Sequence, residues 1–186
     1  MKKCYWFVLS VALLAGVLLA ARSFLLPSVI QLPHLSGELT VLTTTHNDLQ
    51  RQYRVYAPAQ LPEAPAALFV FHGSVSTGAS MRELTARQFD RLADEQGLVV
   101  VYPDGIERHW NDCRASASYQ ANVRDIDDVG FVRRMIEELK ASHGIDADRV
   151  YATGLSNGGH MTLRLALEAP ELMAGYAPIA ANLPVD

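Results

Sequence analysis

The chain has 186 residues, of which 49% are hydrophobic and 19% are charged, with 12 Gly, 9 Pro and 2 Cys. This is the composition of an ordinary globular protein, and it excludes a disordered chain, a collagen-like chain and a disulfide scaffold. The formal net charge is −4 and no run of five like charges occurs, so nucleic acid is not an expected partner.

The N-terminus has the pattern of an export signal. Lys2-Lys3 precedes an apolar run, Cys4–Ala21, that ends in small residues. We expect residues 1–21 to be a signal peptide, which makes the protein secreted, either extracellular or periplasmic. The alternative is an uncleaved membrane anchor through residues 4–21, because 18 apolar residues just span the hydrocarbon layer. Residues 22–38 are expected to form a linker, and 39–186 the domain.

The first half of that domain predicts strands. Two β-branched and aromatic stretches, Leu39–Thr44 and Gln52–Ala57, flank the turn cluster His46-Asn47-Asp48 and indicate an antiparallel hairpin at a sheet edge. Two continuous apolar runs, Ala66–Phe71 and Leu98–Tyr102, are typical of central parallel strands that are covered on both faces.

Two apolar stripes predict helices. Between the central strands, one helix is expected, with Gly97 as its C-terminal cap and the following residues at helical spacing: Leu84, Gln88, Phe89, Leu92 and Ala93. A second helix is expected to begin at Asp127-Asp128 and to end at Gly144, with these residues on its apolar face: Phe131, Val132, Met135, Ile136 and Leu139. We interpret Asp127 and Asp128 as a helix cap rather than as catalytic acids.

The last predicted elements are the strand Val150–Thr153, the helix Gly158–Leu167 and the strand Tyr176–Ala180. Strands that alternate with helices predict an α/β fold with a mostly parallel sheet, to which the antiparallel hairpin is added.

A G-x-S-x-G motif lies between the strand after Arg149 and the helix that follows. In Gly154-Leu155-Ser156-Asn157-Gly158, the glycines allow a strand-to-helix turn too tight for a Cβ. Such a turn exposes the Ser156 hydroxyl as a nucleophile and points the Asn157 amide at a developing oxyanion. The alternative is a glycine-rich turn with an idle serine.

A second oxyanion donor is expected from the loop after Ala66–Phe71. There, His72-Gly73-Ser74 is followed by small residues, and Gly73 lets the backbone approach a ligand. The amide of Ser74 or Val75 is the candidate donor. We interpret His72 as a structural residue that is bonded to this loop.

Several strings occur in an order that resembles the secreted esterase family of polyhydroxybutyrate depolymerases and feruloyl or acetylxylan esterases. These strings are Arg54-Val55-Tyr56, Phe71-His72-Gly73, Leu92-Ala93-Asp94, Val101-Tyr102-Pro103-Asp104-Gly105, Trp110-Asn111, Asp127-Asp128-Val129-Gly130-Phe131, Arg149-Val150-Tyr151 and Thr153-Gly154-Leu155-Ser156-Asn157-Gly158-Gly159.

The resemblance implies an α/β-hydrolase fold and a serine esterase that forms an acyl-enzyme at Ser156. The oxyanion amides would belong to Asn157 and Ser74, and the substrate would be an ester, either small or polymeric. Trp110 and Asn111 are candidate substrate-binding residues, because they follow the carboxyl end of a central strand. A packing role for Trp110 stays open. No cofactor and no metal is implied, because no His, Cys and carboxylate cluster has ligand spacing.

The sequence departs from the family's order of Ser, then acid, then His. After Ser156 the one histidine is His160, which lies one turn into the predicted helix and cannot turn back to the serine. We therefore expect the triad acid and histidine beyond residue 186, and a fold that is C-terminally incomplete at 39–186. A partner for Cys113 is expected there too, unless its thiol is simply buried.

Two other functions are compatible with this sequence. An exported acyl peptidase would use the same fold and the same turn, since neither distinguishes an ester from an amide. A non-catalytic pseudoenzyme or envelope-anchored binding protein would lack a triad histidine altogether.

Overall fold

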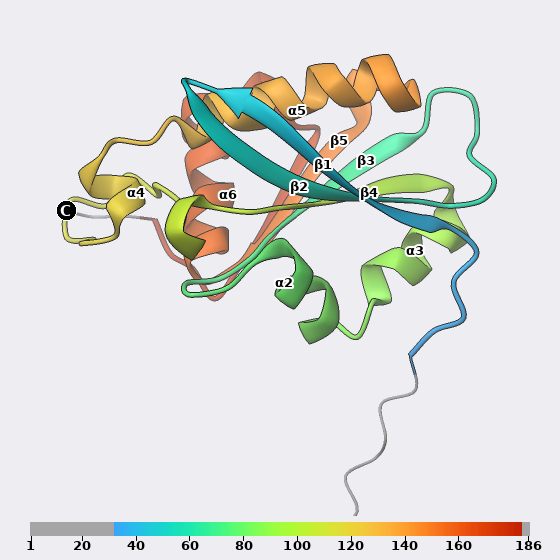
Figure 1. The fold of residues 1–186 in the computed structure, drawn as a ribbon, viewed down its shortest axis with the longest axis horizontal. Coiled ribbons are helices and arrows are strands. Elements are labelled where there is room, and N and C mark those ends of the chain that lie inside the picture. Colours follow the sequence, from blue (N-terminus) through green and yellow to red (C-terminus); the bar gives the residue numbers. More distant parts are fainter. Residues whose placement is uncertain (1–31, 184–186) are drawn as a thin grey trace, which may run out of the picture. The chain divides into compact units, whose positions relative to one another are not determined.

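The computed structural model describes residues 32–183, and the part from Pro33 onward forms one compact unit (Figure 1). The predicted signal or anchor, 1–21, and the first part of the predicted linker lie outside the described residues. Among the residues that are described, no helix is both long and apolar enough to cross a membrane.

The core of the domain is one mixed sheet with the strand order β1-β2-β4-β3-β5-β6. Its strands are β1 (Glu38–His46), β2 (Leu49–Ala57), β3 (Ala66–Phe71), β4 (Leu98–Pro103), β5 (Val150–Leu155) and β6 (Gly175–Ile179). The pairs β1/β2 and β2/β4 are antiparallel, whereas β3/β4, β3/β5 and β5/β6 are parallel. The predicted α/β sheet with its antiparallel hairpin at one edge is thus confirmed.

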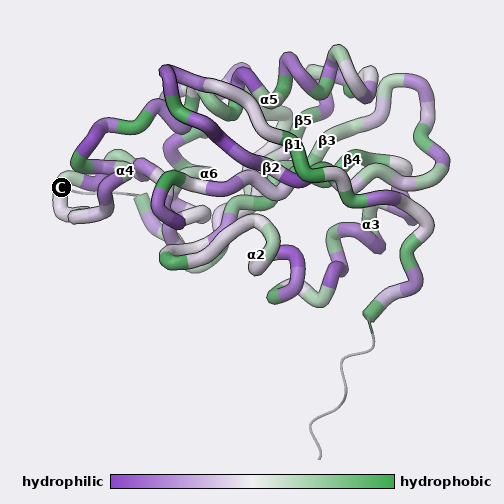
Figure 2. The backbone as a smooth tube through the Cα atoms, viewed as in Figure 1, coloured by the Kyte–Doolittle hydropathy of each residue, from purple (hydrophilic) through white to green (hydrophobic). Residues whose placement is uncertain are grey.

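The helices connect these strands. They are α2 (Gly78–Leu84), α3 (Gln88–Gln96), α4 (Gln120–Val123), α5 (Asp128–His143) and α6 (Asn157–Glu168), with short 3₁₀ turns η1 (Ile106–Arg108), η2 (Ala147–Arg149) and η3 (Pro170–Leu172). Apolar and polar residues alternate along α5 in Figure 2, as expected of a helix with one buried face.

The central strands are apolar on both faces because each face packs against helices. Phe69, Phe71 and Val101 belong to the cluster that contains residues of α5 and α6. Val100 and Tyr102 belong to the other cluster, which includes residues of α2 and α3. Side chains of a strand alternate between the two faces of a sheet, so the continuous apolar runs of the sequence fill both layers.

The prediction of a single helix between β3 and β4 is wrong, because the structure has two helices there. Helix α2 ends at Leu84, which is 67% exposed and does not belong to the buried stripe. Ala86 and Arg87 have φ values of 49° and 57°, in the left-handed region that no helix can continue through. Helix α3 then ends at Gly97 in a left-handed cap, as predicted.

The interpretation of Asp127 and Asp128 as a cap holds for one of the two residues. Asp127 is the N-cap of α5, and its carboxylate accepts a hydrogen bond of 2.7 Å from the Gly130 amide. Asp128 is fully buried and points inward, where it accepts hydrogen bonds of 2.6 Å from Arg51 and 2.7 Å from the Asn111 amide. Its role is therefore a buried ion pair and not a cap.

Candidate active site

Ser156 forms a sharp turn between β5 and α6. Its backbone has φ 55° and ψ −116°, a strained conformation for a residue with a side chain, and the residue is exposed. Two hydrogen bonds of 2.9 Å hold the turn: the Ser156 amide donates to the Ile179 carbonyl, and the His160 amide donates to the Ser156 carbonyl. The strand–turn–helix context that gives the G-x-S-x-G motif its meaning is present.

The two glycines of the motif are required by close backbone packing. A Cβ at Gly158 would lie against the carbonyl oxygens of Phe71 and His72, closer than real Cβ atoms approach backbone. A Cβ at Gly154 would likewise meet the backbone of Gly158. The expected lack of room at these two positions is therefore confirmed.

Replacing Gly158 with alanine should destabilise the domain more than replacing Gly144 does. Gly144 has open space around it, and alanine there costs about 1 kcal/mol because its φ is +63°. At Gly158 the added methyl must displace β3 backbone, and we expect a loss of about 3 kcal/mol. Urea unfolding of both variants measures the difference; equal losses would mean that the turn can relax.

The loop after β3 lies directly beside the turn. A Cβ built on Gly73 would be 3.7 Å from the Ser156 Cβ, so this loop and the serine are neighbours. His72 is fully buried, its Nδ1 lies 2.7 Å from the Gly73 carbonyl, and its Nε2 accepts from the Gly105 amide at 2.9 Å. Burial lowers the pKa of His72, which keeps the ring neutral. His72 thus has the structural role that the sequence indicated.

Ser74 is tied to a distant part of the chain. Its hydroxyl donates a hydrogen bond of 3.1 Å to the Tyr119 hydroxyl. The next residue, Val75, has φ 56°, and its carbonyl accepts a hydrogen bond from the Arg108 guanidinium. The loop that would present the Ser74 amide is therefore held by side chains from outside it.

The Asn157 side chain is used entirely to hold the segment after β4. Its Oδ1 accepts from the Trp110 amide at 2.8 Å, and its Nδ2 donates to the Trp110 carbonyl at 3.1 Å. The same Nδ2 donates to Asp112 at 2.7 Å. An oxyanion contact of Asn157 would therefore come from its backbone amide at the N-terminus of α6. The assignment of Asn157 and Ser74 to an oxyanion hole stays a prediction.

Trp110 has the packing role that the sequence left open. The side chain is fully buried, its indole N–H donates to the His72 carbonyl at 3.0 Å, and its ring packs edge-on against Phe71 at 5.2 Å. It thereby joins the β3 loop to the segment after β4. A direct contact between Trp110 and substrate stays a prediction.

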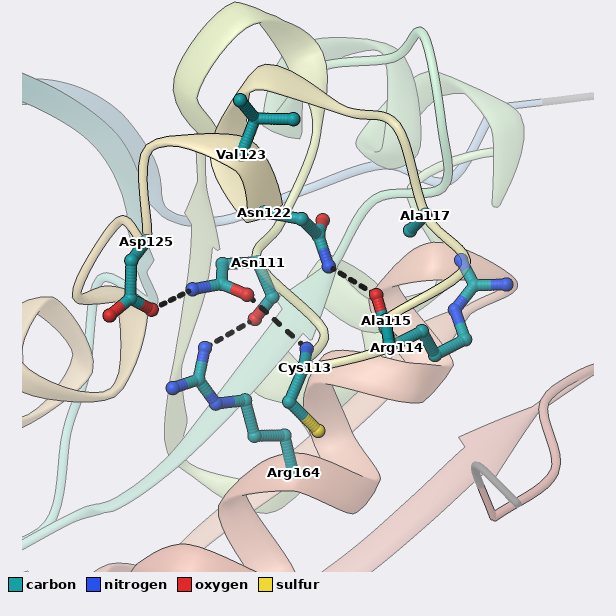
Figure 3. Close-up of a pocket in the computed structure, with 9 residues that line it drawn as sticks. All are labelled: Asn111, Cys113, Arg114, Ala115, Ala117, Asn122, Val123, Asp125 and Arg164. Carbon is teal, nitrogen blue, oxygen red and sulfur yellow. Dashed lines mark hydrogen bonds between the residues drawn. The ribbon is translucent and has the colours of Figure 1, made fainter. Parts of the chain in front are cut away.

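Asn111 lines a polar pocket of about 350 Å³ (Figure 3). Its side-chain NH₂ group donates to Asp125 at 3.1 Å and to the Ile126 carbonyl at 3.0 Å, while Arg164 donates to the backbone carbonyl of Asn111 at 2.7 Å. These contacts fill much of the hydrogen-bonding capacity of Asn111. The pocket also includes Cys113, whose expected disulfide partner stays a prediction.

Asp112 was not identified from the sequence, although it is 1% exposed and lies beside Asn157. Burial raises its pKa, but hydrogen bonds from Arg114, Asn122 and Asn157 together lower the pKa below its ordinary value. No sequence signal marks this residue, because its partners come from three separate parts of the chain.

The lowered pKa of Asp112 predicts acid sensitivity. A carboxyl whose pKa is lower in the folded state stabilises the fold above its unfolded pKa, about 3.9, and this stability is lost as the pH falls through the folded value. We expect the free energy of unfolding of the protein to fall below about pH 4. Asp112→Asn should reduce part of this loss of unfolding free energy at low pH, which urea unfolding at a series of pH values measures. The same pH dependence in both proteins would contradict the prediction.

The His160 ring does not face the Ser156 hydroxyl. Its Nδ1 lies 3.1 Å from the Ser156 carbonyl oxygen, and its Nε2 lies 3.3 Å from Asn182 Oδ1. Both ring nitrogens are directed at groups other than the serine hydroxyl. Among residues 32–183, no cluster of three His, Cys, Asp or Glu side chains could hold a metal ion.

The chain is similar in sequence to several curated esterases. Over 140 residues the chain is 38% identical to NocK of Nocardia uniformis subsp. tsuyamanensis, an esterase by name, covering 72% of this chain and 39% of NocK. It is 31% identical over 126 residues to poly(3-hydroxyalkanoate) depolymerase C of Paucimonas lemoignei, covering 67% and 30% of the two chains. It is 28% identical over 159 residues to feruloyl esterase B of Thermothelomyces thermophilus, covering 84% and 53%.

The chain is a homologue of these esterases. No family model matches it. The chain spans 30–53% of the length of these three relatives. The relatives are carboxylic ester hydrolases, so the resemblance that the sequence motifs indicated is confirmed.

Solved structures of esterases share the fold. An acetyl xylan esterase from Aspergillus awamori superposes with a TM-score of 0.57 at 22% identity, over 76% of this chain and 53% of that one. An S-formylglutathione hydrolase from Staphylococcus aureus superposes with a TM-score of 0.59 at 17% identity, over 81% and 59%. The chain therefore has the α/β-hydrolase fold.

Proposed function

We propose that this chain carries the nucleophile of an exported serine esterase that cleaves carboxylic esters through an acyl-enzyme at Ser156. The observation that carries the proposal is the exposed serine in the strained turn between β5 and α6. Homology to ester hydrolases supports the reaction class. Polyhydroxyalkanoate, feruloyl and acetyl esters are the substrate types that the names of the relatives indicate.

The proposed reaction has two steps. The Ser156 oxygen attacks the ester carbonyl carbon, its proton passes to a histidine base, and the amides of Asn157 and Ser74 stabilise the negative oxygen. The carbon–oxygen bond to the alcohol then breaks, and the alcohol leaves with that proton. Water adds to the acyl-enzyme in the same way and releases the acid, which regenerates the serine.

The histidine base is proposed to come from a part of the protein outside residues 1–186. Support comes from His160, whose ring nitrogens face the Ser156 carbonyl and Asn182. A base must come within about 2.6–3.2 Å of the proton that it accepts. The relatives extend well beyond the matched region, which leaves room for such a residue.

Hydrolysis of p-nitrophenyl esters tests this proposal. We expect little turnover by residues 1–186 alone. We expect clear turnover by the longer protein that the uninterrupted reading frame around them encodes. His160→Ala should change neither result. Fast turnover by the 186-residue chain that persists in His160→Ala would show that the base lies elsewhere in this sequence.

Export is the second part of the proposal, and it rests on Lys2-Lys3 and the apolar run to Ala21. Fractionation of cells that express a C-terminally tagged protein tests it. We expect the tag in the medium or periplasm without residues 1–21, or in the membrane with them. Recovery in the cytosol with Met1 intact would refute both forms.

A further inference from the structure

A series of hydrogen bonds, with one cation–π approach in the middle, links the two residues that the proposed function assigns to the oxyanion hole. Asn157 Nδ2 donates to Asp112 Oδ2 at 2.7 Å. The same oxygen accepts from Arg114 Nη2 at 2.7 Å and from Nε at 3.0 Å. The Arg114 guanidinium lies 5.9 Å from the centre of the Tyr119 ring. The Tyr119 hydroxyl, finally, accepts from Ser74 at 3.1 Å.

One end of this series is buried, at Asn157 and Asp112, whereas Arg114, Tyr119 and Ser74 are half-buried. Asp112 is 1% exposed, and the hydrogen bond to its carboxylate raises the pKa of Arg114. The Tyr119 ring is stacked on His109, with 4.1 Å between ring centres and 20° between ring planes. The charge-assisted hydrogen bonds to the buried Asp112 carboxylate are stronger and more directional than those at an exposed surface.

The loop that carries Ser74 needs external support. It contains Gly73, and Val75 has a φ of 56°, so no regular secondary structure determines its path. An oxyanion hole works only if two amides meet one oxygen at about 2.7–3.1 Å. A displacement of about 1 Å in such a site can cost about 100-fold in rate. The distance between the β3 loop and the Asn157 turn therefore matters for catalysis.

We propose that Asp112 and Tyr119 are positioning residues, which act through Arg114 to hold Asn157 and Ser74 at the separation that one oxyanion requires. This inference rests on the proposed function. It assigns a role to the segment from Asp112 to Tyr119, which is hydrogen-bonded to both Asn157 and Ser74 but does not contain the nucleophile.

Tyr119→Phe tests the series at one end, because it removes the hydroxyl and keeps the ring on His109 and Arg114. In the longer protein that the uninterrupted reading frame encodes, we expect kcat to fall about 10-fold while KM changes less than about twofold. A misplaced donor weakens mainly the stabilisation of the transition state. The matched control is Tyr53→Phe, which removes a hydroxyl bonded to Glu138 of α5, outside the series, and should leave kcat unchanged.

A double-mutant cycle tests whether the series acts as a unit. Asp112→Asn alone should also lower kcat, and Asp112→Asn combined with Tyr119→Phe should lose no more than about the larger single loss. Tyr53→Phe should add nothing to either variant. Losses that multiply, or a rise in KM with kcat unchanged, would overturn the proposal, because separate structural defects behave in that way.

Deuterium uptake in the 186-residue chain provides a readout that does not need turnover. The peptide 155–161 contains the Ser156 and His160 amides, which are hydrogen-bonded in the turn. We expect Tyr119→Phe to speed its uptake about threefold, and Tyr53→Phe to leave it unchanged. If no form of the protein hydrolyses esters, the proposed function fails. Deuterium uptake alone then shows whether Tyr119 holds the turn at Ser156. If Ser156-dependent hydrolysis and uptake are both unaffected by Tyr119→Phe, only the positioning role is wrong.

Discussion

Replacing Ser156 with alanine is expected to lower kcat for p-nitrophenyl ester hydrolysis by about 10⁴- to 10⁶-fold in the longer protein that the uninterrupted reading frame encodes. Loss of the nucleophile removes the acyl-enzyme route, and only the oxyanion hole and substrate binding remain to speed attack by water. The side chain is exposed, so the free energy of unfolding should change by less than about 0.5 kcal/mol.

The matched control is Ser142→Ala, at an exposed serine on α5 whose hydroxyl donates to the Glu138 carbonyl. It should keep the rate of the unsubstituted protein. A Ser156→Ala variant that retains a tenth or more of the activity would mean that another group is the nucleophile. Mass spectrometry after a short incubation with substrate should likewise find the acyl adduct on the peptide that contains Ser156.

Asp128→Asn is expected to destabilise the domain by about 3–5 kcal/mol, whereas Asp127→Asn should change its stability by less than about 0.5 kcal/mol. The two substitutions are identical in chemistry and adjacent in sequence. Asp128 accepts from Arg51 with one oxygen and from the Asn111 amide with the other. An asparagine must turn its NH₂ group toward one of these donors and leaves the buried Arg51 charge uncompensated.

At position 127 asparagine caps a helix as well as aspartate does, and the side chain is 45% exposed. Urea unfolding of the two variants measures the difference directly. Similar losses in both would mean that water reaches Arg51 once the carboxylate is gone. A further variant, Arg51→Met with Asp128→Leu, should recover much of the lost stability, because apolar pairs often replace buried ion pairs without loss.

This pair of residues shows where prediction from sequence ends. The pattern of apolar residues after Asp128 identified α5 and its buried face, because helical periodicity is a local property. Which of the two aspartates turns inward depends on Arg51, which lies 77 residues earlier in the chain. No local pattern contains that information.

The strands and the turn at Ser156 were predictable for the same reason. Continuous apolar runs such as Ala66–Phe71 reflect burial on both faces, and the paired glycines reflect the lack of space around the serine. The break at Ala86 and Arg87 was not predictable, because residues other than glycine seldom adopt a left-handed backbone. The contacts of Asp112 and Tyr119 were also beyond reach, since the fold brings their partners together.

The hydrogen bond from the Ser156 amide to the Ile179 carbonyl has a consequence for the order of assembly. The turn at the serine is bonded to a strand that the chain reaches only after α6 and η3. During translation, residues 150–168 can emerge from the ribosome and form β5 and α6 before β6 exists. The serine then lacks one of its two backbone anchors, so the nucleophile acquires its final geometry only when residue 179 has left the exit tunnel and β6 has paired with β5.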